Sequence, residues 1–171
     1  DARMDFHVVN SGFDNLINTI RSRETLLRAS TEALARISCA GAYSNLAQEE
    51  WYVRFQEEVL DGVQKSNCPA QLKWIQEESE NADGFIYELL FRSKTPLSLA
   101  SILSNLSVKR VASSDLLEIR YSAPDPKLTQ DLLQILNDSF IERYQQIKRR
   151  EVGSVVQFFE VEVARSYERL Q

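Results

Sequence analysis

The sequence predicts a helix-rich α+β fold. Its base is a small mixed sheet packed with helices, to which an inserted helical hairpin and one long projecting C-terminal helix are added. Helical periodicity covers most of the chain, and strand-like alternation is confined to short stretches near the N-terminus and around residues 107–121. Only five glycines and four prolines occur, which favours long helices. The 171 residues, 43% hydrophobic and 26% charged, are typical of one folded domain, residues 1–171.

The N-terminal part is predicted as a strand followed by a helix. The β-like run Phe6-His7-Val8-Val9 ends at a turn that closes with Gly12. Apolar residues at helical spacing then predict one helix that runs to a stop at Gly41. These residues are Leu16, Ile20, Leu27 and Leu34, with Ile17 and Ile37 beside them.

Residues 40–93 are predicted as an inserted helical hairpin. Its helices cover residues 46–63 and about 70–91, and Pro69 lies in the break because proline cannot continue a helix from inside. We expect the two helices to pack antiparallel through apolar seams, with Trp51 and Trp74 in or beside the seam. Simple packing is the favoured role of both rings over an aromatic ligand site.

The same segment is acidic. It holds four Lys/Arg against ten Asp/Glu, a net charge of −6 within a chain of net charge −5. Nucleic acid is therefore not expected as a partner, because phosphate binding needs a basic face. Two solvated helix faces are the simplest interpretation of these charges.

A shorter helix and a β-hairpin follow. Thr95-Pro96 is expected to open the helix, because threonine caps free amides and proline is tolerated at the first helical position. The period then changes to two, which predicts strands at residues 107–111 and 117–121 around a turn at residues 112–115. The expected buried side of the helix consists of Leu99, Ile102, Leu103 and Leu106.

The longest predicted element is a helix over residues 126–171. Asp125 can cap its free amides, and Pro126 can occupy its first position. A continuous helix of about 45 residues would be about 65–70 Å long. It cannot bury its apolar stripe against a base this small, so it needs another helix from its own chain or from a neighbour. Gly153 is a candidate bend, since glycine costs about 1 kcal/mol relative to alanine in a helix interior.

The cysteines and the termini leave the compartment open. Cys39 and Cys68 fit neither a metal-binding nor a CxxC spacing, so a disulfide and two buried free thiols remain equal alternatives. No apolar run approaches the roughly 20 residues that cross a bilayer, and no signal peptide is visible. The chain is either cytosolic or part of a longer membrane protein.

The stretch around the predicted long helix carries a resemblance to a known family. The run from Ser114 to Pro126, with its junction Ser122-Ala123-Pro124-Asp125-Pro126, resembles the strand-to-helix signature of Wzz-type polysaccharide chain-length determinants, the polysaccharide co-polymerase family. Downstream, Phe140-Ile141-Glu142-Arg143-Tyr144, Lys148-Arg149-Arg150 and Val156-Gln157-Phe158-Phe159-Glu160 continue the pattern. The resemblance covers about 75 residues well and about 25 near Ser22-Arg23 moderately, whereas residues 40–93 depart from it.

The resemblance implies a periplasmic domain of a bacterial inner-membrane protein, of which this chain is an excised part that ends inside the long helix. Family members are anchored by flanking membrane helices and form closed homo-oligomers. They regulate the chain length of lipopolysaccharide O-antigen, capsule or exopolysaccharide together with a polymerase or export machinery. No catalysis and no cofactor are implied for this domain.

A search for reaction chemistry finds no constellation that predicts an enzyme. His7 is the only histidine, and no phosphate loop, HExxH or GxSxG motif is present. Adjacent glutamates such as Glu77 and Glu78 diverge by about 100° on a helix, so they do not form a glycosidase pair. We therefore expect no catalytic, cofactor-binding or metal-binding residues.

The basic stretch Lys148, Arg149 and Arg150 has two interpretations. It can be a solvated patch on an exposed helix, which is the favoured one. It can also contact an anionic glycan, lipid head groups or the acidic hairpin of a neighbouring copy in a homo-oligomer.

Two other classes of function stay open at this point. The first is a soluble helical adaptor or scaffold that oligomerises through the long helix. The second is a glycan-active enzyme, which requires a cleft with two facing carboxylates.

Overall fold

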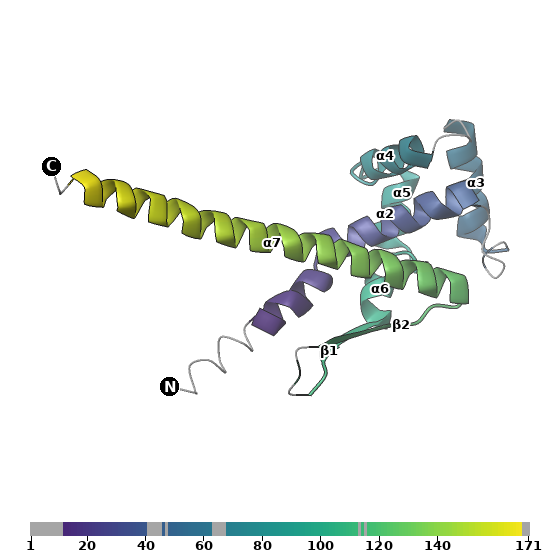
Figure 1. The fold of residues 1–171 in the computed structure, drawn as a ribbon. Helices are drawn as coiled ribbons and strands as arrows, with labels where there is room; N and C mark the ends of the chain where they lie inside the picture. The colour runs from purple at the N-terminus through teal and green to yellow at the C-terminus, as the bar shows by residue number, and fades with distance from the viewer. Residues whose placement is uncertain are drawn as a thin grey trace.

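The computed structural model describes residues 12–40, 46, 48–62, 68–112, 114 and 116–168. Within these ranges the protein is a helix-rich α+β fold with a small two-stranded antiparallel sheet, which confirms the predicted fold class. Helices and a β-hairpin gather into a base, and the long helix α7 crosses this base and projects from it (Figure 1). A mixed sheet needs a third strand, and the one predicted at residues 6–9 lies outside the described residues.

The first predicted helix is divided in two. Residues 12–20 are helical, the chain bends at Arg21 and Ser22, and α2 then spans Arg23–Ala40. The Ser22 hydroxyl accepts a hydrogen bond from the Thr25 amide (3.3 Å), and the Thr25 hydroxyl donates to the Thr19 carbonyl (2.8 Å). The prediction of one continuous helix was wrong because Ser22 starts a second helix by capping it.

The inserted segment contains more breaks than its apolar pattern predicts. It consists of α3 (Glu50–Gly62), α4 (Cys68–Glu78), the single turn α5 (Phe85–Tyr87) and the π-helix η1 (Glu88–Arg92). The expected helix over residues 70–91 is interrupted at residues 79–84. There the Asn81 side chain accepts from the Asp83 amide (3.3 Å), and the Gly84 amide donates to the Asn81 carbonyl (2.9 Å). These local bonds replace the helical ones.

The two longer helices of the insertion, α3 and α4, contact different elements. α3 faces α5 and η1, where the Arg54 guanidinium lies 4.4 Å from the centre of the Phe85 ring and 3.7 Å from Glu88. α4 instead packs on α2 and is joined to it by a disulfide between Cys39 and Cys68. The expected seam between two continuous helices is therefore replaced by two separate packing contacts.

A short helix, α6, precedes the β-hairpin and spans Leu99–Asn105. Its cap is Ser98, whose hydroxyl accepts from the Ser101 amide (3.3 Å), and not the predicted Thr95. Thr95 is buried one turn earlier, and its carbonyl accepts from the Ser98 amide (3.0 Å). Leu103 was also expected inside but is exposed, because a helix of two turns covers the core with one narrow face.

The β-hairpin agrees with the predicted alternation. β1 (Leu106–Arg110) pairs antiparallel with β2 (Leu117–Tyr121), in a register that places Leu106 opposite Tyr121 and Val108 opposite Ile119. Leu106, Val108 and Tyr121 are buried, so one face of the ribbon joins the core while the other faces solvent.

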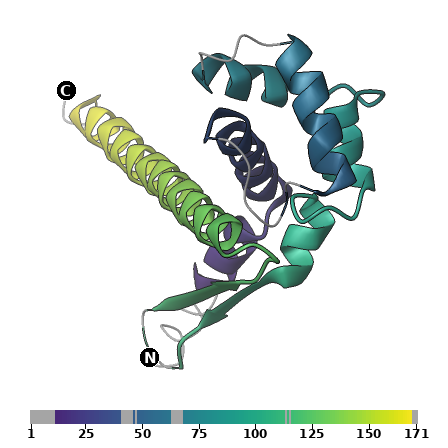
Figure 2. The ribbon, with the colours of Figure 1, turned by 90° about the vertical axis from the view of Figure 1, so that its right-hand side faces the viewer.

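The longest helix, α7, is continuous over Pro126–Glu168 and therefore passes through Gly153 without interruption. Its first turns cover α2, as Figure 2 shows from the end of the base. The α7 residues in this contact are fully buried and belong to the single hydrophobic core. They are Leu128, Leu132, Ile135 and Leu136. None of the described helices is both long and apolar enough to span a bilayer.

Candidate functional site

The junction between β2 and α7 is held by a buried carboxylate. Asp125 is 2% exposed, and one of its oxygens accepts from the amides of Lys127 (2.8 Å) and Leu128 (3.0 Å). The Thr129 hydroxyl accepts from the Ala123 amide (3.1 Å) and donates to the Asp125 carbonyl (3.0 Å). Asp125 thus caps α7 and Pro126 is its first residue, as predicted. Together these bonds fix the direction in which the helix leaves the sheet.

Ion pairs join α7 to α2 along the line where the two helices cross. Arg28 pairs with Glu142 (2.5 Å), and Arg36 with Asp131 (3.5 Å). These side chains are partly exposed, so each pair contributes at most about 1 kcal/mol. Their main effect is on orientation and register, because a third pair, Glu24 of α2 with Arg143 of α7 (3.2 Å), has the opposite polarity.

Arg28 also bonds to Glu32 on its own helix (2.7 Å). That hydrogen bond, with a smaller contribution from Glu142, raises the pKa of Arg28. The pairing keeps the guanidinium fixed in the α2–α7 contact. Sequence spacing predicts Arg28 with Glu32, one turn apart, but contains no signal for Glu142, which is 114 positions away.

A small polar cavity of about 60 Å³ lies between α2 and α7 beside Arg28. Ser139 is 4% exposed, and its hydroxyl has no hydrogen-bond partner among the described residues. A cavity of this size, with several polar atoms around it, can hold water. Its lining residues are Glu24, Thr25, Arg28, Ser139, Arg143 and Gln146.

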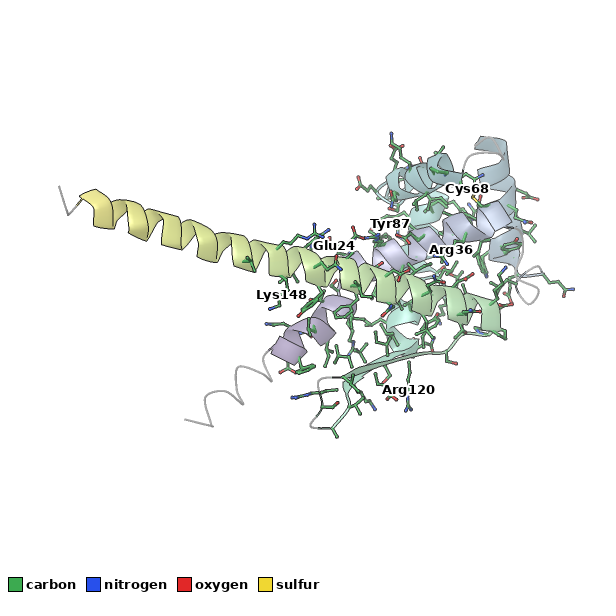
Figure 3. All side chains as sticks on the ribbon, in the orientation of Figure 1. Glu24, Arg36, Cys68, Tyr87, Arg120 and Lys148 are labelled. Carbon is green, nitrogen blue, oxygen red and sulfur yellow. A yellow bond between two sulfur atoms is a disulfide. The ribbon has the colours of Figure 1, made fainter. Side chains whose placement is uncertain are left out.

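The basic stretch on α7 lies far from the junction. Lys148 follows Asp125 by 23 positions, about 35 Å along a helix, and Figure 3 places it on the projecting side of Glu24. Lys148 and Arg149 are exposed. The Lys148 ammonium lies 5.8 Å from the centre of the Tyr144 ring, and Arg149 donates a long bond to Gln145 (3.4 Å). The Arg150 side chain lies outside the described residues.

A cavity of about 180 Å³ lies between α3 and the α5–η1 segment. Trp51 lines it and is half-buried, with an indole nitrogen that has no hydrogen-bond partner in the described part of the chain. Trp74 also packs against the core. Both rings thus contact the core.

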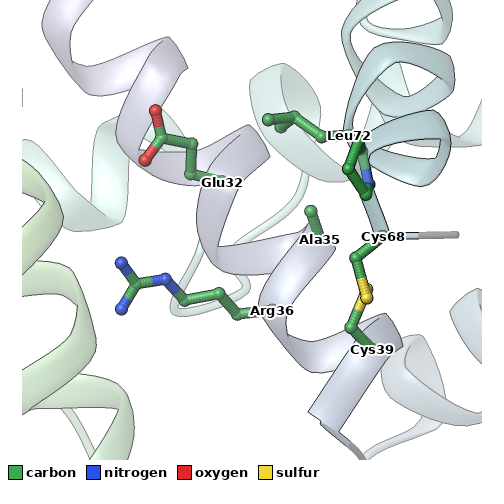
Figure 4. Close-up of a pocket in the computed structure, with 7 residues that line it drawn as sticks. Glu32, Ala35, Arg36, Cys39, Cys68 and Leu72 are labelled. Atoms are coloured by element: carbon green, nitrogen blue, oxygen red, sulfur yellow. A yellow bond between two sulfur atoms is a disulfide. The ribbon is translucent and has the colours of Figure 1, made fainter.

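A groove of about 420 Å³ lies beside the disulfide (Figure 4). Ala35 and Leu72 form its apolar floor with Cys39 and Cys68, and Glu32 and Arg36 lie at its α2 side. Its two charged groups are engaged in ion pairs, Glu32 with Arg28 and Arg36 with Asp131. The groove is thus an apolar gap between α2 and α4 with ion-paired side chains at its edge.

Among the described residues, no group of three or more His, Cys, Asp or Glu side chains is placed to hold a metal ion. Of the adjacent glutamates, Glu58 pairs with Arg54 (3.0 Å) and Glu77 with Lys73 (3.6 Å), each one turn away on the same helix. His7 lies outside the described residues. The features described above are the helix cap at Asp125, the ion pairs between α2 and α7, and the basic stretch on α7.

The described residues form an α+β base with an internal disulfide, from which one capped helix projects. Comparison with known proteins finds no matching family model, no similar characterised protein and no similar solved structure.

Proposed function

We propose that this chain is a non-catalytic, periplasmic part of an inner-membrane protein that regulates the chain length of a bacterial surface polysaccharide. The observation that carries the proposal is the ordered series of motifs from the Ser122–Pro126 junction to the basic stretch. The junction gives a capped helix that projects from a small sheet, which is the arrangement that the resemblance implies.

The disulfide supports the compartment in this proposal. Cys39 and Cys68 are 5.8 Å apart between their Cα atoms and are bonded. Structural disulfides persist in oxidising compartments such as the periplasm and are rare in the cytosol. In the proposal the protein forms a homo-oligomer and works with a polymerase or export machinery, and glycan is a further candidate contact.

Deletion of the gene, followed by complementation, tests the function. The deletion strain is expected to lose the preferred length of its O-antigen, capsule or exopolysaccharide, as measured on gels of the extracted polysaccharide. Complementation with the wild-type full-length protein should restore it. An unchanged length distribution after deletion would contradict the proposal.

A soluble helical adaptor is the second candidate, favoured by the exposed apolar residues Ile141 and Val152 on α7. Thiol alkylation in intact cells separates the two candidates. The periplasmic protein should keep Cys39 and Cys68 oxidised and unreactive, whereas a cytosolic adaptor should present two reduced, alkylated cysteines.

A further inference from the structure

The helix α7 has a second face, opposite to the one that covers α2. Ile141, Lys148 and Val152 lie within an arc of about 40° on a helix of 3.6 residues per turn. Leu132 and Ser139 lie on the other side of the same helix and are buried. Ile141 is 43% exposed and Val152 is 62% exposed, so the described base leaves this second face open to solvent.

This outer stripe of α7 is both apolar and basic. Tyr144 borders it, is 37% exposed, and lies under the Lys148 ammonium. Arg149 is exposed beside it. We define the outer stripe as Ile141, Tyr144, Lys148, Arg149 and Val152. An exposed apolar stripe flanked by cations is typical of a surface that binds an acidic partner with an apolar centre.

An acidic surface with an apolar centre occurs at the start of α3 of the same chain. Val53 is 44% exposed, with Glu49 one turn before it and Glu57 one turn after it. Both glutamates are exposed, and neither forms an ion pair within the described residues. Arg54, the neighbour of Val53 in the sequence, is already paired with Glu58 and Glu88. We define the outer α3 face as Glu49, Val53 and Glu57.

The outer stripe and the outer α3 face cannot meet within one copy. Figure 2 shows α7 on one side of α2 and α3 on the other. Two different patches on opposite sides of one chain generate a head-to-tail contact between copies, which closes into a ring or extends as a filament.

Charge also selects between the possible partners of the outer stripe. Parallel pairing of α7 with α7 of a second copy would place Lys148 and Arg149 beside their own counterparts, and like charges at such distances oppose binding. The outer α3 face instead offers one carboxylate on each side of an apolar residue.

We propose that the outer stripe of α7 in one copy docks on the outer α3 face of the next copy. The proposal names the contact surfaces of the homo-oligomer and in that sense rests on the proposed function. In this proposal the role of the inserted segment is to present the acidic surface of the contact.

A charge-exchange experiment on the full-length protein tests this contact. Lys148→Glu with Arg149→Glu should weaken self-association about tenfold, and Glu49→Lys with Glu57→Lys should do the same. A mixture of the two double variants should regain most of the affinity, because the exchanged charges again attract each other. Analytical ultracentrifugation measures the association.

The matched control is Lys109→Glu with Arg120→Glu, which reverses two exposed cations on the β-hairpin and should leave self-association unchanged. A photo-crosslinker at Val53 should capture residues 141–152 of another copy. Unchanged association in either double variant, no recovery in the mixture, or capture of a different region would overturn the contact.

The same strains separate this contact from the proposed function. If gene deletion alters the polysaccharide length while the charge variants associate normally, the contact is wrong and the function stands. If association follows the charges while deletion leaves the polysaccharide unchanged, the contact stands and the function is wrong.

Discussion

At the scale of single residues, short polar side chains that bond to free backbone groups set the starts of several helices. Asp125 satisfies two amides that a helix start otherwise leaves free, and Thr129 closes the same turn from the helix side. Ser22 and Ser98 do the same for α2 and α6. The helices α2, α6 and α7 thus begin where a short polar side chain replaces a missing helical bond.

Removal of the Asp125 carboxylate should destabilise the protein. Asp125→Ala leaves the amides of Lys127 and Leu128 without an acceptor in a buried position, and we expect a loss of about 2 kcal/mol in the free energy of unfolding. Urea denaturation measures it. Ser122→Ala, at an exposed position three residues earlier, is the control and should change little. Equal stability of the two variants would show that the cap contributes nothing.

Tyr121 should make the fold sensitive to alkaline pH. Burial raises its pKa to about 12 from an ordinary value near 10. Below pH 10 the phenol is protonated in both states, so its contribution is constant. Between pH 10 and 12 the unfolded state loses the proton first, and stability should fall.

The alkaline effect can be assigned by substitution. Tyr121→Phe should remove this part of the pH dependence together with one late step in the ultraviolet titration of phenolate. Its loss of the long bond to the Pro96 carbonyl (3.4 Å) should cost little at neutral pH. A wild-type protein in which all tyrosines titrate near pH 10 would contradict the burial of Tyr121.

At the scale of elements, the insertion is stabilised by its attachment to α2. α4 lies on α2 through Ile75 and Gln71, both buried, and the Gln71 side chain accepts from the Ser38 hydroxyl (2.7 Å). The disulfide closes the chain between these two helices and so encloses α3. The position of α3 therefore depends on a covalent link as well as on its own contacts with η1.

Reduction of the disulfide should cost about 3–4 kcal/mol in the free energy of unfolding, because closure of a loop of this length restricts the unfolded chain. Thermal denaturation with and without a thiol reductant measures the change. The matched variant Cys39→Ala with Cys68→Ala should start at the lower stability and be insensitive to the reductant. A wild-type protein unaffected by reduction would contradict a structural role for the bond.

At the scale of the whole molecule, stability is concentrated at one end of α7. The first part of the helix belongs to the core through Leu132 and Leu136, both fully buried, whereas Ile141 and Val152 face solvent. Gly153 has no neighbouring atom within 4 Å of where a Cβ would lie, which agrees with a helix that has left the base. Assembly can therefore use the outer part of α7 without disturbing the core.

This division can be measured with two matched truncations on one helix. Leu136→Ala should cost about 3 kcal/mol, since it removes buried methyl groups and leaves a cavity. Ile141→Ala should cost less than about 0.5 kcal/mol in the monomer, because that side chain is exposed. Urea denaturation at low protein concentration compares them. Similar losses in both variants would contradict the division between the buried and outer faces.

Much of the fold follows from local signals in the sequence. The β-hairpin, the Asp125 cap and the single long helix agree with alternation, capping chemistry and a proline-free periodic run. The breaks at Ser22 and at residues 79–84 were missed because the apolar period continues through them. There, hydrogen bonds of the Ser22 and Asn81 side chains replace helical backbone bonds. The spacing of apolar residues contains no information about such bonds.

The candidate site likewise has some features that local sequence predicts and others that depend on tertiary packing. The sequence by itself determined the junction at Asp125 and Pro126 and the clustering of Lys148 and Arg149, because capping and charge are local properties. Tertiary structure decided that Arg28 meets Glu142, that Cys39 meets Cys68, and that the outer stripe lies opposite the α2 contact. Those facts depend on which helices pack together, and packing selects among long-range pairings that a single sequence leaves equivalent.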